Sequence, residues 1–168
     1  MTQTPTKTQI LLARLAVGLI VVFAVLGFAF YGFLAEVRQR IWRNLIERPS
    51  GPMTFRFFLQ PIMASIAAWR DGVKDAREGR SPYLWTIATD PAKARGRLDE
   101  GVIATARILL LGLAMDVIYQ AIVFETFHPG EAAIISILLA FVPYLLLRGP
   151  ISRVVAWWLA RRSANDAQ

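Results

Sequence analysis

Three long apolar runs dominate the hydrophobic pattern of this chain, at residues 10–35, 101–126 and 127–148. A helix that crosses the hydrocarbon core of a bilayer needs roughly 20 mostly apolar residues. The first two runs reach that length, and the third does so if the turn at its start lies at the membrane interface. Pro129 and Gly130 extend a helix poorly, so we expect the chain to reverse there. The pattern predicts three transmembrane helices, the last two joined by a tight outer turn.

The first apolar run has a second interpretation, a cleaved signal peptide. The run exceeds the roughly 7–15 apolar residues of a signal peptide, and the bulky sequence at residues 31–36 does not suit cleavage. We therefore expect an uncleaved helix that follows a polar tail at residues 1–9. Arg14 lies close enough to its end to extend toward the headgroups.

A shorter amphipathic pattern covers residues 54–79. One face of the expected helix is apolar and the other is polar, which is typical of a helix that lies in the membrane interface. The apolar face carries Phe55, Phe58, Leu59, Ile62, Ile66 and Trp69, and the other face carries Arg56, Gln60, Ala67 and Arg70. The pattern predicts an interfacial or shallow re-entrant helix. The alternative is a fourth transmembrane helix, which would reverse the sidedness of everything before or after it.

Local signals set two helix boundaries. Asp90 followed by Pro91 is a typical helix start, with the aspartate as N-cap. Arg148-Gly149-Pro150 indicates the end of one helix and the start of another. The second of these signals predicts a separate amphipathic helix at residues 149–162, before a polar tail at residues 163–168.

The composition agrees with an all-α integral membrane protein that has three transmembrane helices plus amphipathic interfacial helices. Of the 168 residues, 55% are hydrophobic, and the mean hydropathy is positive. The chain has no Cys and a single His, which excludes disulfides, Cys-based metal sites and any site that needs two His residues from one chain. We expect no cofactor and no bound metal.

Positive charge is distributed unevenly around the expected spans. Residues 36–100 hold twelve Lys and Arg residues and residues 148–168 hold four, whereas the turn at 125–131 has none. Because Lys and Arg accumulate on the cytoplasmic side, three spans place the N-terminus in the periplasm and the basic region 36–100 and the C-terminus in the cytoplasm. This explains the net charge of +7 without nucleic acid as a partner.

The most informative polar residue is Asp116, in the middle of the second span. A charged residue there costs on the order of 3 kcal/mol on insertion scales. Tyr119 and Gln120 follow on the same helix face, within reach of a hydrogen bond. Asp116 is therefore either a protonatable or cation-binding group or a neutral, hydrogen-bonded residue that orients helices or meets a partner subunit. We expect Arg107 to lie on a different face and to extend toward the cytoplasmic headgroups.

Other basic and aromatic side chains suit contact with lipid headgroups. They are Arg56, Arg70, Arg148, Arg153, Trp69, Trp85 and Trp158. The charged segment 70–80 lacks the residue order of a phosphate-binding loop, and no hydrolase or metalloprotease motif is present. We expect Glu125, His128 and Glu131, at the outer turn, to be solvated.

The stretch from Phe55 to Arg153 resembles a family of small bacterial inner-membrane proteins with no assigned activity. The resemblance lies in FFLQPIMASIAAWRDGVKDAREGRSPYLW, in MDVIYQ and in PYLLLRGP. It implies a location in the bacterial inner membrane and no particular reaction.

Three functions remain as hypotheses. The first is a non-catalytic accessory or scaffold subunit that holds anionic lipid on its basic cytoplasmic face and docks a protein partner or a second copy. The alternative is a small oligomeric transporter or proton-coupled component that uses Asp116. A lipid-modifying enzyme that uses Asp71, Asp75 or His128 is the third, and we do not expect an enzyme.

Overall fold

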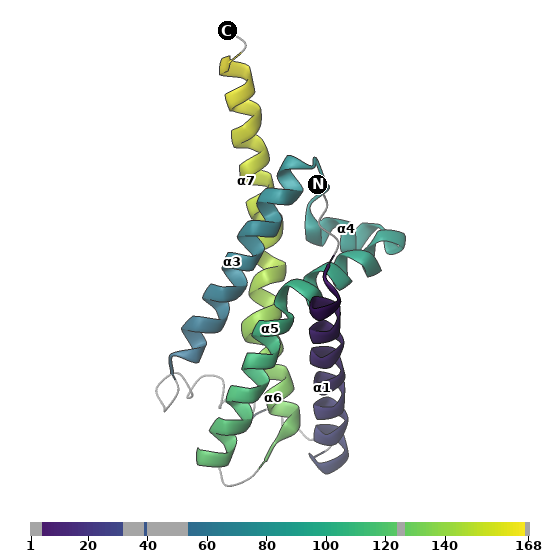
Figure 1. The fold of residues 1–168 in the computed structure, drawn as a ribbon, viewed down its shortest axis with the longest axis vertical. Coiled ribbons are helices and arrows are strands. Elements are labelled where there is room, and N and C mark those ends of the chain that lie inside the picture. The colour runs from purple at the N-terminus through teal and green to yellow at the C-terminus, as the bar shows by residue number, and fades with distance from the viewer. Residues whose placement is uncertain (1–4, 32–38, 40–53, 124–126, 167–168) are drawn as a thin grey trace.

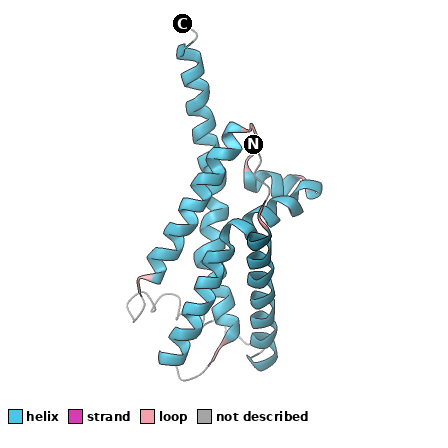
Figure 2. Ribbon diagram, viewed as in Figure 1, coloured by secondary structure: helices cyan, strands magenta, loops and turns pink. Residues whose placement is uncertain are grey.

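A computed structural model describes residues 5–31, 39, 54–123 and 127–166, and these described residues contain helices and connections without a strand (Figure 2). The long helices lie side by side as a bundle, and the last of them continues beyond it (Figure 1). The helices are α1 (Lys7–Tyr31), α3 (Arg56–Arg77), α4 (Tyr83–Thr89), α5 (Pro91–Val123), α6 (Pro129–Ser136), the π-helical turn η2 (Ile137–Phe141) and α7 (Val142–Asp166).

Among the described residues, three helices are long and apolar enough to cross a membrane, in agreement with the predicted number. They are Lys7–Tyr31, Pro91–Val123 and the continuous helix Pro129–Asn165. α5 begins at Pro91 as predicted, and the Asp90 carboxylate accepts a hydrogen bond from the Lys93 amide at 3.2 Å. The predicted break at residues 148–150 is wrong, because α7 continues through it. Ile151 packs against Gly72 of α3, and this contact helps to hold the helix together across Pro150.

The π-helical turn η2 ends at Phe141, two residues before Pro143. In a regular helix, a proline ring collides with the carbonyl four residues earlier, which here belongs to Leu139, inside η2. A π turn widens the backbone at that point, so the helix from Pro129 continues past the proline.

The bundle has two ends with different chemistry. The turn end carries Phe127–Gly130, and the charged end carries Asp75, Glu100 and Arg148. α1 and α5 run from the charged end to the turn end, whereas α3 and α6–α7 run the opposite way (Figure 1). Tyr31, the last residue of α1, donates a hydrogen bond from its hydroxyl to the Phe127 carbonyl at 2.9 Å. α1 therefore begins at the same end as Glu100 and Arg148. Three spans would place residue 10 on the opposite side from that basic region.

Helix α3 covers nearly the whole depth of the bundle. Arg56 contacts Asp116 near the turn end, and Asp75 contacts Arg148 at the charged end. At about 1.5 Å per residue, the interval from Arg56 to Asp75 spans about 28 Å, close to the roughly 30 Å of a hydrocarbon core. The structure has this helix at Arg56–Arg77, inside the predicted range of about 54–79. The helix closes at Gly79, whose φ is 65°, and the Arg80 amide donates to the Asp75 carbonyl at 2.9 Å.

Candidate functional site

A buried ion pair joins α3 to α5 near the turn end. Arg56 Nη2 lies 2.6 Å from Asp116 Oδ1, and the two side chains are 1% and 0% exposed. A buried charge without a counter-charge is strongly destabilising. Each charge of this pair is therefore stable inside the protein only because the other is beside it. The expectation that Arg56 lies against lipid headgroups is corrected here: its guanidinium points into the bundle, where Asp116 requires a cation.

The pair extends into a network that reaches α1. Gln120 donates from Nε2 to Asp116 Oδ2 at 2.5 Å, and its Oε1 accepts the His128 amide N–H at 2.5 Å. Gln120 Nε2 also donates to the His128 carbonyl at 3.1 Å, and the His128 ring stacks on Tyr31 with 4.7 Å between centroids. The expected contact between Asp116 and Gln120 is confirmed. Tyr119, the other expected neighbour, is buried.

A second polar network lies at the charged end. Arg148 binds Asp75 with two hydrogen bonds, from Nε at 2.8 Å and from Nη2 at 3.0 Å, and reaches Glu100 at 2.9 Å. Arg97 bridges the same two carboxylates at 3.0 and 3.3 Å. This network connects α3, α5 and α7. Arg148 is therefore buried and paired, so the expectation that it contacts headgroups is also corrected.

Two tyrosines complete this charged-end network. Tyr144 donates to Asp71 Oδ2 at 2.6 Å and accepts a hydrogen bond from Arg148 at 2.7 Å. Tyr83 donates to the Arg97 carbonyl at 2.6 Å, and the Arg148 guanidinium lies 4.3 Å from the centre of its ring. Burial raises the pKa of the Tyr83 hydroxyl to about 12, so Tyr83 stays a neutral donor at physiological pH. At the start of α5, hydrogen bonds from Lys93 hold the pKa of the Asp90 carboxyl below its usual value.

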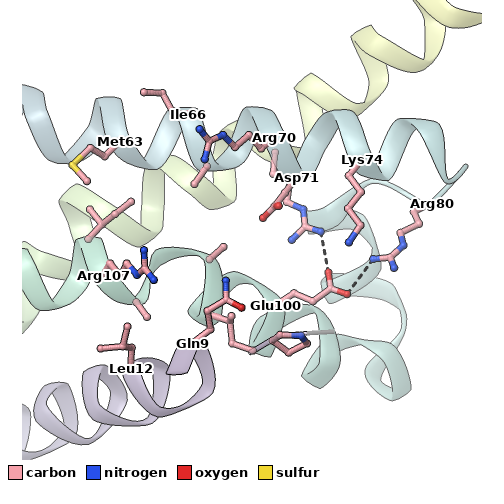
Figure 3. Close-up of a pocket in the computed structure, with 17 residues that line it drawn as sticks. Gln9, Leu12, Met63, Ile66, Arg70, Asp71, Lys74, Arg80, Glu100 and Arg107 are labelled. Carbon is pink, nitrogen blue, oxygen red and sulfur yellow. Dashed lines mark hydrogen bonds and ion pairs between the residues drawn. The ribbon is translucent and has the colours of Figure 1, made fainter. Parts of the chain in front are cut away.

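A groove of about 730 Å³ runs between α1, α3 and α5 toward the charged end (Figure 3). Its lining combines apolar side chains with basic ones. Among the residues that line it, Leu12, Met63, Ile66, Ile103 and Ile108 are apolar, and Arg70, Lys74, Arg80, Arg107 and Arg148 are basic. Asp71 and Glu100 also line the groove, and hydrogen bonds hold both: Asp71 accepts from Tyr144, and Glu100 from arginines. Positive charge therefore remains in excess along this groove.

Three of these basic residues are not paired with an acidic residue in the part of the chain that the structure describes. Arg70, Lys74 and Arg107 make no ion pair with another described residue, in contrast to Arg80 and Arg148. In Figure 3, Arg70 and Lys74 extend from α3 and Arg107 from α5. The structure thus combines an apolar groove with unneutralised cations along it.

The other expected headgroup residues lie on the surface. Arg70, Arg107 and Arg153 are exposed, as are Trp69, Trp85 and Trp158. At the outer turn, Glu131 is buried, although we expected it to be solvated, and Glu125 lies outside the described residues.

The residues of the enzyme hypothesis do not come together. Asp71 and Asp75 lie at the charged end, whereas His128 lies at the turn end. Within the described residues, no group of three or more His, Cys, Asp or Glu residues suits a metal ion.

Sequence reasoning missed most of the charged-end network. Asp75, Arg97 and Glu100 sit in strongly polar stretches, which are usually solvated, and nothing in their spacing marks them as buried. A usable signal existed only for the other pair, because an aspartate inside an apolar span requires a partner and Arg56 begins an amphipathic helix.

Comparisons of the chain with protein-family models, curated proteins and solved structures find no match.

Proposed function

We propose that this chain is a non-catalytic integral membrane protein with four helices in the bilayer, and that it binds an anionic phospholipid in the groove between α1, α3 and α5. The observation that carries the lipid proposal is the unneutralised basic trio Arg70, Lys74 and Arg107 along an apolar groove. The proposal has two parts, the membrane placement of α3 and the chemistry of the groove.

The placement of α3 in lipid follows from its inverted polarity. Phe55, Phe58, Leu59, Ile62, Ile66 and Trp69 are 39–64% exposed, whereas Arg56, Gln60 and Asp75 on the same helix are buried. In water this arrangement would leave a continuous apolar face exposed. Each Å² of that apolar surface costs about 25 cal/mol of free energy relative to burial. In hydrocarbon the apolar face is solvated by acyl chains, and the polar residues are satisfied inside the protein.

Four spans also change the expected sidedness. α1 and α3 cross in opposite directions, so the start of α1 lies on the same side as the charged end. That end carries the eleven Lys and Arg residues of segments 70–97 and 148–162, against four arginines in the sequence between α1 and α3 (residues 32–53) and none in the turn at 127–131. We infer that the charged end faces the cytoplasm, which places both the N-terminus and the C-terminus there. The membrane is proposed to be a bacterial inner membrane.

The groove suits a phospholipid better than a soluble anion. Its apolar walls match acyl chains, and its basic residues match a phosphate group. A soluble anion would leave the apolar walls without a partner. An anionic headgroup is favoured over a zwitterionic one because the groove carries a net positive charge and its acidic residues already accept hydrogen bonds from the protein.

The test is lipid retention measured by native mass spectrometry after reconstitution with phosphatidylglycerol or phosphatidylcholine. We expect preferential retention of phosphatidylglycerol. The triple variant Arg70→Gln, Lys74→Gln, Arg107→Gln should weaken it at least tenfold, since each cation near an anionic surface contributes about 1 kcal/mol. The matched control is Arg153→Gln, Arg161→Gln, Arg162→Gln, which removes the same charge from exposed positions outside the groove. Equal weakening by both triples would refute a groove site and leave only general surface attraction.

The transporter alternative is less well supported. One carboxylate oxygen of Asp116 pairs with Arg56, and the other accepts a hydrogen bond from Gln120. Both oxygens are therefore used to hold helices together. A scaffold that presents a bound lipid to a partner protein is consistent with these contacts.

A further inference from the structure

Among the residues that the structure describes, two buried polar side chains, Gln60 and Ser136, have no hydrogen-bond partner. Neither Nε2 nor Oε1 of Gln60 makes a hydrogen bond within the described residues, and the same holds for Oγ of Ser136. Both residues are 0% exposed. A buried polar group without a partner destabilises the fold, and native proteins commonly satisfy such groups with ordered water.

The three polar atoms converge on one place. A Cβ atom added to Gly112 would lie 3.0 Å from Ser136 Oγ and 3.2 Å from each amide atom of Gln60. All three atoms therefore lie within about 6 Å of one another, and none of them bonds another. A water molecule with hydrogen bonds of about 2.8 Å bridges polar groups at such separations.

The surroundings leave few other ways to satisfy these groups. Gln60 lies one helical turn after Arg56, and Gly112 lies one turn before Asp116. Ala64 and Ala140, one turn further along α3 and η2, are fully buried and supply no polar side chain. Within a bilayer no solvent reaches the outside of the bundle at this depth, so polar partners must come from inside it.

We propose that this place, bounded by Gln60, Ser136 and Gly112, is an internal hydration site that binds water between α3, α5 and α6. Water there donates to Gln60 Oε1 and accepts from Gln60 Nε2 and Ser136 Oγ. It extends the polar contacts between α3 and α5 beyond the Arg56–Asp116 pair and into α6. The site is separate from the lipid groove and does not depend on it.

The first test is a double-mutant cycle on thermal unfolding, with Gln60→Leu, Ser136→Ala and the double variant in nanodiscs. If water bridges the two side chains, either single change lowers the melting temperature and the second change adds little to the first. If both side chains are dry, each change removes an unsatisfied group, so the melting temperature rises additively and the proposal is overturned. Gln60→Leu combined with Ser152→Ala is the control and should be additive, because Ser152 bonds the Gly149 carbonyl on α7.

A second measurement tests the hydration site without the Gln60→Leu and Ser136→Ala variants, in case those variants fold poorly. The chain has no cysteine, so Ser136→Cys and Ala140→Cys each introduce a unique thiol at a fully buried position, one turn apart. An X-ray pulse converts bound water into hydroxyl radicals, which react with groups beside that water. The thiol at 136 should therefore be oxidised at least fivefold faster than the thiol at 140. Equal rates would overturn the proposal.

Discussion

Arg56 and Asp116 show how single residues organise this molecule. They lie 60 positions apart in the chain, yet their side chains meet at 2.6 Å in a fully buried site. Two charges are stable there only as a pair that is also hydrogen-bonded, which Gln120 provides. The pair therefore fixes the register of α3 against α5.

Replacing Asp116 tests this role. Asp116→Asn leaves the Arg56 charge buried without its carboxylate, so we expect a loss of stability of about 3–5 kcal/mol. The measurement is thermal unfolding in detergent. The double variant Arg56→Met, Asp116→Leu removes both charges and should recover most of the loss. Asp99→Asn, at an exposed position on the same helix, is the control. A melting temperature for Asp116→Asn equal to that of Asp99→Asn would show that the pair does not hold the helices together.

A second prediction at this scale concerns Tyr83 and pH. Its pKa rises from 10 to about 12 because burial disfavours the tyrosinate. The neutral hydroxyl therefore contributes stability in full below pH 10, and this contribution is lost as the pH rises through about 12. The measurement is tyrosinate absorbance during an alkaline titration. The difference between the wild type and Tyr83→Phe should show one tyrosine that ionises near pH 12. If the missing tyrosine ionised near pH 10 instead, its hydroxyl would not be buried as described.

Small residues let the helices of this bundle approach closely. A Cβ atom at Gly27 of α1 would lie 2.6 Å from the Gly130 Cα at the start of α6, so the two backbones touch. Close backbone contact of this kind replaces hydrophobic burial as an attractive force between helices in lipid. Gly18 on the same helix has no atom within 4 Å of such a Cβ. The two glycines of α1 thus have different roles.

Their replacement by alanine should have opposite effects. Gly27→Ala forces the α1 and α6 backbones apart and should destabilise the protein by about 1–3 kcal/mol. Gly18→Ala removes a flexible residue from a helix at no steric cost and should be neutral or stabilising, by up to about 1 kcal/mol. Thermal unfolding of the two variants side by side is the measurement. A similar loss in both would mean that α1 does not dock through Gly27.

Across the described helices, many large apolar side chains are exposed, whereas the Arg56–Asp116 and Asp75–Arg148 pairs are buried. The exposed aromatic and aliphatic face of α3 continues this pattern beyond the three most apolar helices. α7 extends past the bundle with Val154, Trp157 and Trp158 exposed (Figure 1). Arg161 lies 3.7 Å from the ring centre of Trp157 and so keeps a cation beside this aromatic surface.

Topology is the prediction at this scale. Thr6→Cys and Ser163→Cys, introduced into the cysteine-free chain, should react with a membrane-impermeant maleimide from the same side in sealed vesicles. Phe127→Cys should react from the opposite side. A three-span arrangement, with an interfacial α3, would instead place residues 6 and 163 on opposite sides. Reaction before and after permeabilisation separates the two results.

The order of residues alone predicted three helices long and apolar enough to cross a membrane, the start of α5 at Asp90-Pro91 and the contact between Asp116 and Gln120. These features depend on composition and on neighbours within a few positions, so local patterns report them. The partners of Asp116 and Arg148, the continuity of α7 through Gly149-Pro150 and the end of the bundle at which α1 begins were visible only in the folded chain. They depend on side chains tens of residues apart that meet in space, for example Asp75 with Arg148. The amphipathic pattern of α3 marked two faces, and it was the packing that assigned the polar face to the interior and left the apolar one outside.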